Sequence, residues 1–345
     1  MKNTYRAMQI TAPGMLELVE REVPTPGPGE VLIDVEACGI CGADAADIEG
    51  ADPAHQPPRV PGHEVVGRIA AIGAGTPAIW EIGQRVGVGR LGGPCHACTE
   101  CRRGEFQLCR NQPVVGATCD GGYAEMMVAR SSGLVSIPDE LSSEEAAPIL
   151  CAGIATFNAL KTCGAQAGDL VAVLGVGGLG HMALQYARNM GFKVVAIGRG
   201  QDIAEAARTL GAHVYVDTRQ DDATTKLRDM GGAQAIISTI GDAATVSALV
   251  AGLAPQGRLV VLGVAREPLL IAAGQLVAGE RSLAGSITGT PYENEKALDF
   301  SVLTGVRPMT ETMPLEQAFE AYQRMKRGEA EFRMVLTMER SRTAT

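Results

Sequence analysis

The sequence predicts a two-domain α/β protein, with a β-rich region of irregular strands joined to a doubly wound parallel sheet. Three observations support this fold class. The chain has 345 residues, which exceeds the roughly 100–200 residues of one domain. Short apolar runs broken by Gly and Pro fill the first 150 residues. Beyond that point, strand-like runs alternate with segments of helical spacing.

The first region has the pattern of a β-structure with irregular loops. Its short apolar runs are bounded by turn sequences such as TPGPG at 25–29 and GAG at 73–75. Alternating runs between Gly and Pro turns are typical of antiparallel strands. We expect strands at 8–10, 16–19, 31–35, 65–72 and 85–88.

The second region alternates between strand and helix. Strands are expected at 169–174, 194–197, 214–216, 235–238 and 258–262, and helices at 179–190, 204–210 and 243–253. This order predicts parallel βαβ units in a doubly wound sheet. The chain then closes with an amphipathic segment at 315–327 and a strand at 332–338.

Composition excludes several partners. The net charge is −9, and an acidic chain is a poor ligand for nucleic acid or an anionic membrane, which both attract basic surfaces. We see neither a run of about 18 apolar residues nor a signal peptide. A small-molecule substrate and a cytoplasmic location are therefore expected. Nine cysteines in a reducing compartment are more readily interpreted as metal ligands than as disulfides.

Four of these cysteines are clustered. Cys95, Cys98, Cys101 and Cys109 follow the spacing C-x2-C-x2-C-x7-C in a short polar loop. Four thiolates saturate a tetrahedral Zn²⁺ and leave no position for substrate, so the loop predicts a structural zinc site. An iron–sulfur cluster has similar spacings, and four unmetallated thiols are the remaining alternative.

A glycine-rich turn follows the strand expected at 169–174. Gly175, Gly177 and Gly180 form a GxGxxG motif, with Gly178 and Leu179 between them, and a helix is expected directly afterwards. In a βαβ context this motif predicts a dinucleotide site, because its backbone can approach a pyrophosphate at the helix N-terminus. The alternative is a glycine-rich turn that binds nothing.

The second strand of that unit ends without an acid. A carboxylate about 20 residues after the motif usually binds the ribose 2′-hydroxyl of NAD. Here Gly198 occupies the position and Arg199 follows it. An arginine pairs with a 2′-phosphate, so NADP(H) is favoured over NAD(H). Alternatively, Arg199 stacks on the adenine or points to solvent.

Several motifs together carry a family resemblance. These are CGIC at 38–41 with Asp44, PGHE at 61–64, the four-cysteine loop, Cys151, the GxGxxG motif and the ending FRMVL at 332–336. Taken alone, an isolated Cys or His is usually a packed structural residue. As a set, they resemble the zinc-dependent medium-chain alcohol dehydrogenases, particularly microbial and cinnamyl-alcohol-type members. The resemblance implies a GroES-like catalytic domain from 1–152 and 289–345, around a Rossmann domain at 153–288.

The resemblance also implies site roles. A second, catalytic zinc would be bound by Cys41, His63 and Cys151, with one open position, which makes two zinc ions per chain. Asp44 would orient His63, Glu64 would lie behind the metal, and Arg333 would reach the cofactor pyrophosphate. The residues implied to line the nicotinamide are Val264, Ser286 and Ile287. The implied reaction is hydride transfer between NADP(H), or NAD(H), and an alcohol, aldehyde or ketone. A homo-oligomer is implied, with a tetramer expected ahead of a dimer.

The chain departs from the family pattern beside the catalytic cysteine. Many members have Ser or Thr two residues after it and His three residues further on, whereas this chain has Ala43 and Ala46. A methyl group cannot pass a proton. A reductase of an activated C=C bond or an iminium, which needs no such relay, is therefore an alternative function. A non-catalytic zinc- and nucleotide-binding sensor is a third.

Overall fold

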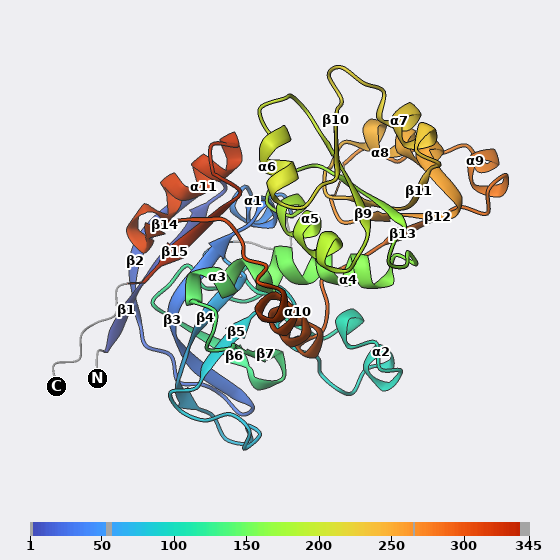
Figure 1. The fold of residues 1–345 in the computed structure, drawn as a ribbon. Coiled ribbons are helices and arrows are strands. Elements are labelled where there is room, and N and C mark those ends of the chain that lie inside the picture. Colours follow the sequence, from blue (N-terminus) through green and yellow to red (C-terminus); the bar gives the residue numbers. More distant parts are fainter. Residues whose placement is uncertain (1–2, 53–56, 265, 339–345) are drawn as a thin grey trace. The chain divides into compact units, whose positions relative to one another are not determined.

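The computed structural model describes residues 3–52, 57–264 and 266–338. The chain divides into two compact units. Unit 1 comprises Met1–Cys151 and Thr288–Thr345, and unit 2 comprises Ala152–Ile287. In Figure 1 unit 1 runs from blue to green in its first segment and from orange to red in its last, and unit 2 runs from green to orange.

Unit 1 is built on a seven-stranded sheet in the order β14-β15-β3-β4-β5-β7, in which β6 also pairs with β3. A separate antiparallel hairpin is formed by β1 and β2. The bounds are β1 Thr4–Ala12, β2 Met15–Glu22, β3 Glu30–Ile40, β4 Glu64–Ile72, β5 Arg85–Val88, β6 Met126–Arg130, β7 Leu134–Ser136, β14 Thr310–Pro314 and β15 Arg333–Thr337. All five strands expected in the first region are present, and most are longer than predicted.

The end of the chain returns to this sheet. The β15 strand pairs antiparallel with β3, so that Met334 lies opposite Ile40 and Thr337 opposite Ala37. Its residues Met334 and Leu336 are fully buried and join the core cluster that contains Ile33 and Ile40. The strand expected at 332–338 is therefore confirmed, and it places the C-terminal segment beside the motifs of residues 38–64.

Helices of unit 1 begin at recognisable caps. Helix α3 (Ser143–Pro148) has a capping box between Ser142 and Glu145, and α10 (Pro291–Thr304) has one between Thr290 and Glu293. These reciprocal bonds satisfy amides that the first helical turn leaves open. The α10 helix was absent from the predicted elements, although Thr290 and Pro291 are sequence signals of a helix start. The other helices are α1 Gly42–Ile48, α2 Thr99–Arg102 and α11 Ala318–Arg327, the last within the predicted amphipathic segment.

Unit 2 is a parallel sheet in the order β10-β9-β8-β11-β12-β13. The bounds are β8 Leu170–Leu174, β9 Lys193–Gly198, β10 Val214–Asp217, β11 Ala233–Ser238, β12 Leu253–Val261 and β13 Ser282–Gly285. Numbered within the unit, the order is 3-2-1-4-5-6, that of a dinucleotide-binding doubly wound sheet, with its switch point between β8 and β11. The predicted fold class is confirmed.

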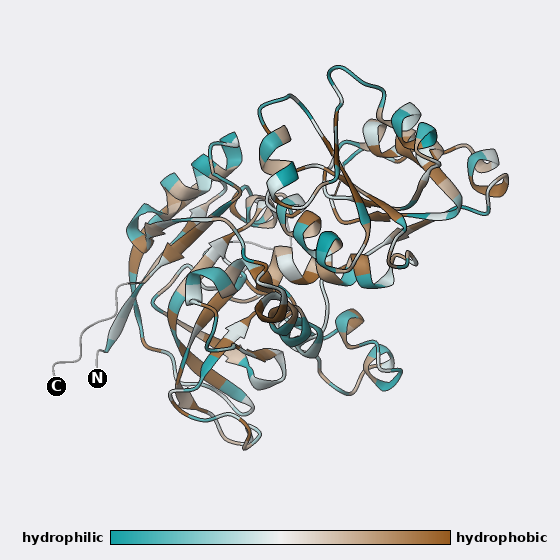
Figure 2. Ribbon diagram, in the orientation of Figure 1, coloured by the Kyte–Doolittle hydropathy of each residue, from teal (hydrophilic) through white to brown (hydrophobic). Residues whose placement is uncertain are grey.

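Helices cover both faces of this sheet (Figure 1). Helices α4 (Ile154–Thr162) and α5 (Gly180–Asn189) pack together, and α7 (Ala223–Asp229) packs with α8 (Ala243–Leu249). Figure 2 shows that the strands are predominantly hydrophobic and the helices amphipathic. Every residue of β8 is buried, as expected for a strand covered on both faces. The remaining helices of the unit are α6 Ala204–Thr209 and α9 Ala273–Val277.

One predicted boundary was wrong. The helix expected at 243–253 ends at Leu249, a 3₁₀ turn occupies Val250–Gly252, and β12 begins at Leu253. Gly252 disfavours helix through its backbone freedom, and Pro255 disfavours helical geometry in the residue before it. The apolar run therefore changes from helix to strand earlier than its spacing indicated. No helix within the described parts of the chain is long and apolar enough to cross a membrane.

Substitution of Gly121 tests how closely the backbone segments of unit 1 pack against one another. A Cβ built on Gly121 would lie 2.0 Å from the carbonyl oxygen of Gly62 and 2.7 Å from that of Pro61. Because neither backbone atom can move freely, we expect Gly121→Ala to destabilise the protein by about 1–3 kcal/mol, the usual range for overpacking. Gly274→Ala is the control, because no atom lies within 4 Å of its added Cβ. In a helix this change should be neutral or stabilising by about 0.5–1 kcal/mol. Urea unfolding of both variants measures the difference, and equal stabilities would contradict the packing argument.

Candidate active site

Unit 1 brings four potential metal-ligating side chains together. Cys41, His63, Glu64 and Cys151 are buried, and their candidate ligand atoms all lie within 4.8 Å of one another. Cys41 immediately precedes α1, His63 immediately precedes β4, and Cys151 lies on a π-helical turn, Ile149–Gly153. Such turns occur frequently at functional sites. The cluster therefore contains all three zinc ligands that the resemblance implied.

The Asp44 carboxylate organises this cluster. Its Oδ1 lies 2.8 Å from Nδ1 of His63, and its Oδ2 accepts a hydrogen bond of 2.9 Å from the backbone N–H of Cys41. Asp44 and His63 are both completely buried. A carboxylate that accepts the Nδ1 proton fixes the tautomer of the ring and leaves Nε2 as the atom able to bind a metal. The position expected for Asp44 is thus occupied by a side chain that orients both His63 and Cys41.

Sequence reasoning missed Tyr123. Its hydroxyl donates to Oδ2 of Asp44 at 2.9 Å, and its side chain is completely buried. The ring passes so close to Gly62 that a Cβ there would lie 2.2 Å from Cδ1 of Tyr123. Gly62 is therefore required by a close approach, as well as by its φ of 98°. No local sequence signal distinguishes Tyr123, because its partner Asp44 is 79 residues away.

The residues of the cluster fit a zinc ion. Nε2 of His63 is buried and has no hydrogen-bond partner among the residues that the structure describes, which is costly for a polar atom that binds nothing. The Sγ atoms of Cys41 and Cys151 lie 3.7 Å apart. Two thiols and one imidazole form a known donor set for catalytic zinc, with a fourth position left for water or substrate.

The groups around Cys41 and His63 stabilise a thiolate and a positively charged ring, whereas the hydrogen bond with Cys41 and burial raise the pKa of the Cys151 thiol. The hydrogen bond from Cys151 holds the pKa of the Cys41 thiol well below its usual value, and contact with His63 acts in the same direction. Burial lowers the pKa of His63, but the charge and hydrogen bond of Asp44 outweigh it and raise this pKa to about 10. A cation in this pocket is therefore stabilised by its surroundings.

Glu64 forms a buried ion pair with Arg333. Nη2 of Arg333 contacts both carboxylate oxygens of Glu64, at 2.6 Å for Oε2. Burial raises the pKa of Glu64 to about 7, whereas the charge of Arg333 opposes this rise. The pair depends on Gly39, because a Cβ there would lie 1.9 Å from Oε2 of Glu64. The pairing of β15 with β3 brings Arg333 to this position, 269 residues from its partner.

The four-cysteine loop forms a second cluster in unit 1. The Sγ atoms of Cys95, Cys98, Cys101 and Cys109 all lie within 4.8 Å of one another. Cys95 Sγ accepts hydrogen bonds from the backbone N–H groups of Ala97 at 3.5 Å and Cys98 at 3.4 Å, and from Nδ2 of Asn111 at 3.4 Å. The bond from Ala97 contributes most to lowering the pKa of Cys95, to about 6. Donors directed at sulfur stabilise a thiolate, the form that binds zinc, so this loop also fits a metal ion.

The glycine motif of unit 2 fits a pyrophosphate. It lies between β8 and α5, with Leu179 at the helix N-cap. A Cβ on Gly180 would lie 1.9 Å from the carbonyl oxygen of Gly175, so the strand and helix pack closely there. At Gly177 no atom lies within 4 Å of an added Cβ. This open backbone at a helix N-terminus is where a dinucleotide motif receives phosphate oxygens.

Other predicted cofactor contacts lie at the carboxyl ends of strands. Gly198 is the last residue of β9, and Arg199 after it is exposed. Val264 follows β12 and is 93% exposed, and Ser286 and Ile287 follow β13. Doubly wound sheets bind ligands at this edge. The roles of these residues toward a cofactor, and that of Arg333, stay predictions.

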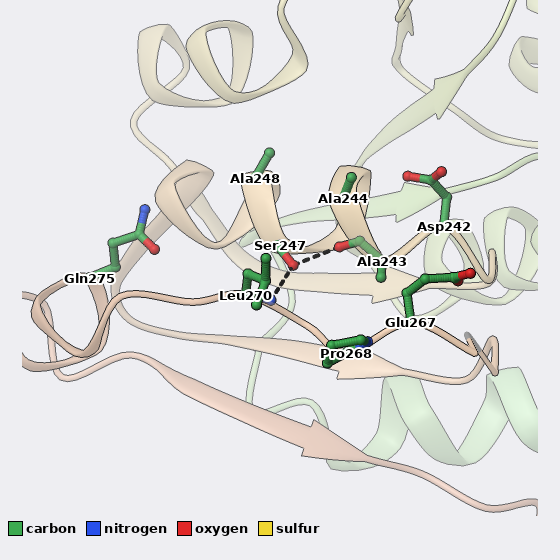
Figure 3. A pocket seen from close by; sticks show the side chains of 9 residues that line it. All are labelled: Asp242, Ala243, Ala244, Ser247, Ala248, Glu267, Pro268, Leu270 and Gln275. Atoms are coloured by element: carbon green, nitrogen blue, oxygen red, sulfur yellow. Dashed lines mark hydrogen bonds between the residues drawn. The ribbon is translucent and has the colours of Figure 1, made fainter.

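A separate cavity of about 570 Å³ lies beside α8 in unit 2 (Figure 3). Asp242 and Glu267 lie at one end of the cavity. The hydroxyl of Ser247 donates a hydrogen bond to the carbonyl of Ala243 and accepts one from the backbone N–H of Leu270. None of its lining residues belongs to either cysteine cluster or to the glycine motif. We therefore assign it no part in the chemistry.

Comparisons with known proteins agree with this geometry. Residues 27–139 match the family described as alcohol dehydrogenase GroES-like domain, and residues 178–302 match zinc-binding dehydrogenase. Alcohol dehydrogenase notN of Aspergillus sp. (strain MF297-2) is 39% identical over 94% of this chain and 95% of its own length. An alcohol dehydrogenase of Geobacillus stearothermophilus is 38% identical over 94% of this chain and 96% of its own.

Solved structures are similar over nearly the whole chain. AibC has a TM-score of 0.91 and 29% identity, covering 98% of this chain and 97% of its own. CAD from Helicobacter pylori, complexed with NADP(H), has a TM-score of 0.87 and 28% identity, covering 99% of this chain and 100% of its own. Acetophenone reductase from Geotrichum candidum, in complex with NAD, has a TM-score of 0.87 and 27% identity over 98% of both chains.

Fold, metal-ligating clusters, nucleotide motif and relatives lead to one assignment. The protein is an enzyme, an alcohol dehydrogenase-like oxidoreductase that uses zinc and a nicotinamide cofactor. The chain belongs to the zinc-dependent medium-chain alcohol dehydrogenase family.

Proposed function

We propose that the chain transfers hydride between NADP(H) and an alcohol or its carbonyl counterpart, with a catalytic zinc bound by Cys41, His63 and Cys151. The observation that carries this proposal is the buried cluster itself, in which Nε2 of His63 has no hydrogen-bond partner within the described parts of the chain. We further propose that Cys95, Cys98, Cys101 and Cys109 bind a second, structural zinc, which makes two per chain.

The proposed zinc ligands and the Asp44 carboxylate have separate roles in this reaction. When bound, the zinc ion supplies a Lewis acid for the substrate oxygen, and the nicotinamide accepts or donates the hydride. Asp44 retains the proton on Nδ1 of His63 and holds Cys41 through its backbone amide. Cys41 and Cys151 contribute thiolate charge. The ligands are thus set before substrate binds, which reduces the reorganisation that the reaction requires.

Glu64 and Arg333 form a buried ion pair within this site. Arg333 neutralises Glu64 inside the protein. We propose that Arg333 also contributes to binding the cofactor pyrophosphate, because guanidinium groups pair with phosphate oxygens.

Proton transfer distinguishes the two candidate substrate classes. Ala43 and Ala46 are exposed on α1, whereas Asp44 of the same helix is buried. Neither methyl group can relay a proton from an alcohol oxygen. This observation favours a second candidate function, reduction of an activated C=C bond or an iminium, in which no alcohol proton has to leave the site.

The cofactor preference and assembly are also proposed. Arg199, exposed directly after β9, supports NADP(H) over NAD(H) through pairing with a 2′-phosphate.

The strand β13 forms an edge of its sheet, and Leu283 on it is 39% exposed, which supports a homo-oligomer, with a tetramer favoured over a dimer. All nine cysteines are free, which supports a reducing, cytoplasmic location.

A substrate panel tests the function. We expect purified enzyme to oxidise NADPH faster than NADH with aldehydes or ketones, and cyclic imines and activated enones should be assayed beside them. Turnover of carbonyls at background rate, together with rapid turnover of an imine or enone, would establish the second candidate instead. Arg199→Asp should remove the preference for NADPH, because a carboxylate repels the 2′-phosphate.

Metal analysis tests the two zinc sites. We expect about two zinc ions per wild-type chain and about one in either Cys98→Ser or His63→Ala. Loss of the four-thiolate site should lower the melting temperature of Cys98→Ser, because the metal closes a loop with little core of its own. His63→Ala should lose activity and the second zinc ion, and because it also removes a partner of the buried Asp44 carboxylate, zinc content and not melting temperature is its readout. A wild-type content of one zinc that is lost in Cys98→Ser and retained in His63→Ala would contradict the catalytic centre.

The role of Asp44 can be separated from that of Tyr123. Asp44→Asn should weaken metal binding about 10–100-fold, the usual effect of losing a partner of a metal-ligating histidine. Tyr123→Phe should cost about 1.5–3 kcal/mol of stability, the range for a hydrogen bond to a charged group, while lowering turnover. Tyr322→Phe is the control. Tyr322 lies on helix α11, and its hydroxyl also donates a hydrogen bond to a carboxylate, that of Glu49 at 2.7 Å, which is not part of the Cys41–His63–Cys151 cluster. Equal zinc content and turnover in all three variants would show that Asp44 does not orient the ligands.

A further inference from the structure

We propose that Arg90 is a specificity-determining residue that binds a carboxylate group of the substrate. Asp47 holds its guanidinium group, and the N–H groups that Asp47 leaves free bind a substrate that carries a carboxylate in addition to its alcohol or carbonyl group. The inference rests on the proposed hydride transfer and deepens it, because it names the class of substrate.

Arg90 lies between the π-helical turn and α1, two segments that contribute to the proposed catalytic centre. It follows β5 by two residues, and a Cβ on the preceding Gly89 would lie 3.0 Å from the carbonyl oxygen of Leu150 on the π-helical turn. On the other side, Arg90 bonds to Asp47, which lies three residues after Asp44 on α1. Residues three apart on a helix share a face. The fold therefore places the guanidinium group of Arg90 beside the metal-ligating cluster.

The Asp47 carboxylate fixes the guanidinium group of Arg90. Nη1 donates to Oδ2 of Asp47, and Nη2 donates to Oδ1 at 3.2 Å. Nη1 also donates to the carbonyl of Val115 at 3.2 Å. The side chain of Asp47 is 5% exposed and that of Arg90 is 20% exposed. Because a two-point pair sets both the plane and the direction of the guanidinium group, a ligand that binds it does not have to order it first.

One edge of this guanidinium group is unused. Arginine has five N–H groups, and the three bonds to Asp47 and Val115 leave the N–H of Nε and one N–H of Nη2 without a partner within the described parts of the chain. Nε is buried in Arg59 and Arg85, which also lack a partner there, but it is not buried in Arg90. The two unused N–H groups are neighbours on one edge and match the two oxygens of a carboxylate.

Charge decides which anion suits this edge. Burial lowers the pKa of Arg90, but the hydrogen bond and the charge of Asp47 outweigh it, and the charges of Asp44 and Cys151 act in the same direction as Asp47. The guanidinium group therefore stays protonated beside the cluster. Because Asp47 offsets its charge, the pair suits a singly charged carboxylate better than a doubly charged phosphate ester.

Matched substrates test the role of Arg90. Turnover is compared for 4-oxobutanoate with butanal and for 4-formylbenzoate with benzaldehyde, two pairs that differ in the distance between carbonyl and carboxylate. We expect wild-type enzyme to prefer the carboxylate member of at least one pair by about tenfold or more in kcat/KM, as for a hydrogen bond between charged groups. Asp47→Asn combined with Arg90→Gln should abolish this preference through KM and leave the uncharged member nearly unchanged. The double variant is used because Arg90→Gln alone would leave the Asp47 charge buried and unpaired.

Two further variants serve as controls. Arg90→Lys keeps the charge but loses the two-point edge, so it should retain only part of the preference. Arg68→Gln should retain all of it, because Arg68 also pairs with a carboxylate, that of Glu36 at 2.9 Å, but contributes to neither cysteine cluster. Zinc content and melting temperature show that each variant is metallated and folded. An equal loss of kcat/KM for both members of each pair would overturn substrate recognition by Arg90.

Binding without turnover separates this proposal from the proposed function. Calorimetry measures the dissociation constants of 4-(hydroxymethyl)benzoate and benzyl alcohol for the wild-type enzyme and the double variant. If neither pair of carbonyls is turned over, but the carboxylate ligand binds more tightly to wild type than to the double variant, the proposed reaction is wrong and the role of Arg90 stands. If carbonyls are turned over, and neither rates nor affinities favour the carboxylate, only the assignment of Arg90 is wrong.

Discussion

The buried carboxylate of Asp44 is the interaction on which the catalytic cluster depends. An ionised carboxylate inside a protein is costly unless each oxygen is satisfied. Here Nδ1 of His63, the amide of Cys41 and the hydroxyl of Tyr123 lie around it. These partners come from three separate segments of the chain. One charge therefore positions two of the proposed zinc ligands and joins them to a distant loop.

Close approach of backbone is the second constraint on both sites. In unit 1, Gly39 leaves room for the Glu64 carboxylate, and Gly62 leaves room for the ring of Tyr123. In unit 2, Gly175 and Gly180 allow the strand and helix of the nucleotide motif to meet. Each glycine is required because a neighbouring group occupies the volume of its missing side chain. The motifs CGIC, PGHE and GxGxxG therefore encode packing as well as chemistry.

The candidate metal ligands and the nucleotide motif belong to different units. Unit 1 contains both clusters of potential metal ligands, and unit 2 contains the glycine motif between β8 and α5.

The sequence by itself determined what depends on local spacing. The four-cysteine loop, the glycine motif with its flanking strand and helix, and the family resemblance are each contained in short segments or in motif sets. The alternating pattern also predicted the doubly wound sheet, because the periods of strands and helices are local properties. Boundaries were less predictable: the helix starting at 243 ended early at Leu249, since Gly and Pro acted against its apolar spacing.

Only the tertiary structure decided the long-range pairs. Arg333 meets Glu64 across 269 residues, and Tyr123 meets Asp44 across 79. Tyr215 fills the space beside Gly198 because two parallel strands align in one register. Such contacts depend on strand order and register, which follow from the burial of a whole sheet and from no single motif. For this reason the proposed zinc ligands and Asp44 could be named from the sequence, whereas the pairing of Arg333 with Glu64 and that of Tyr123 with Asp44 could not.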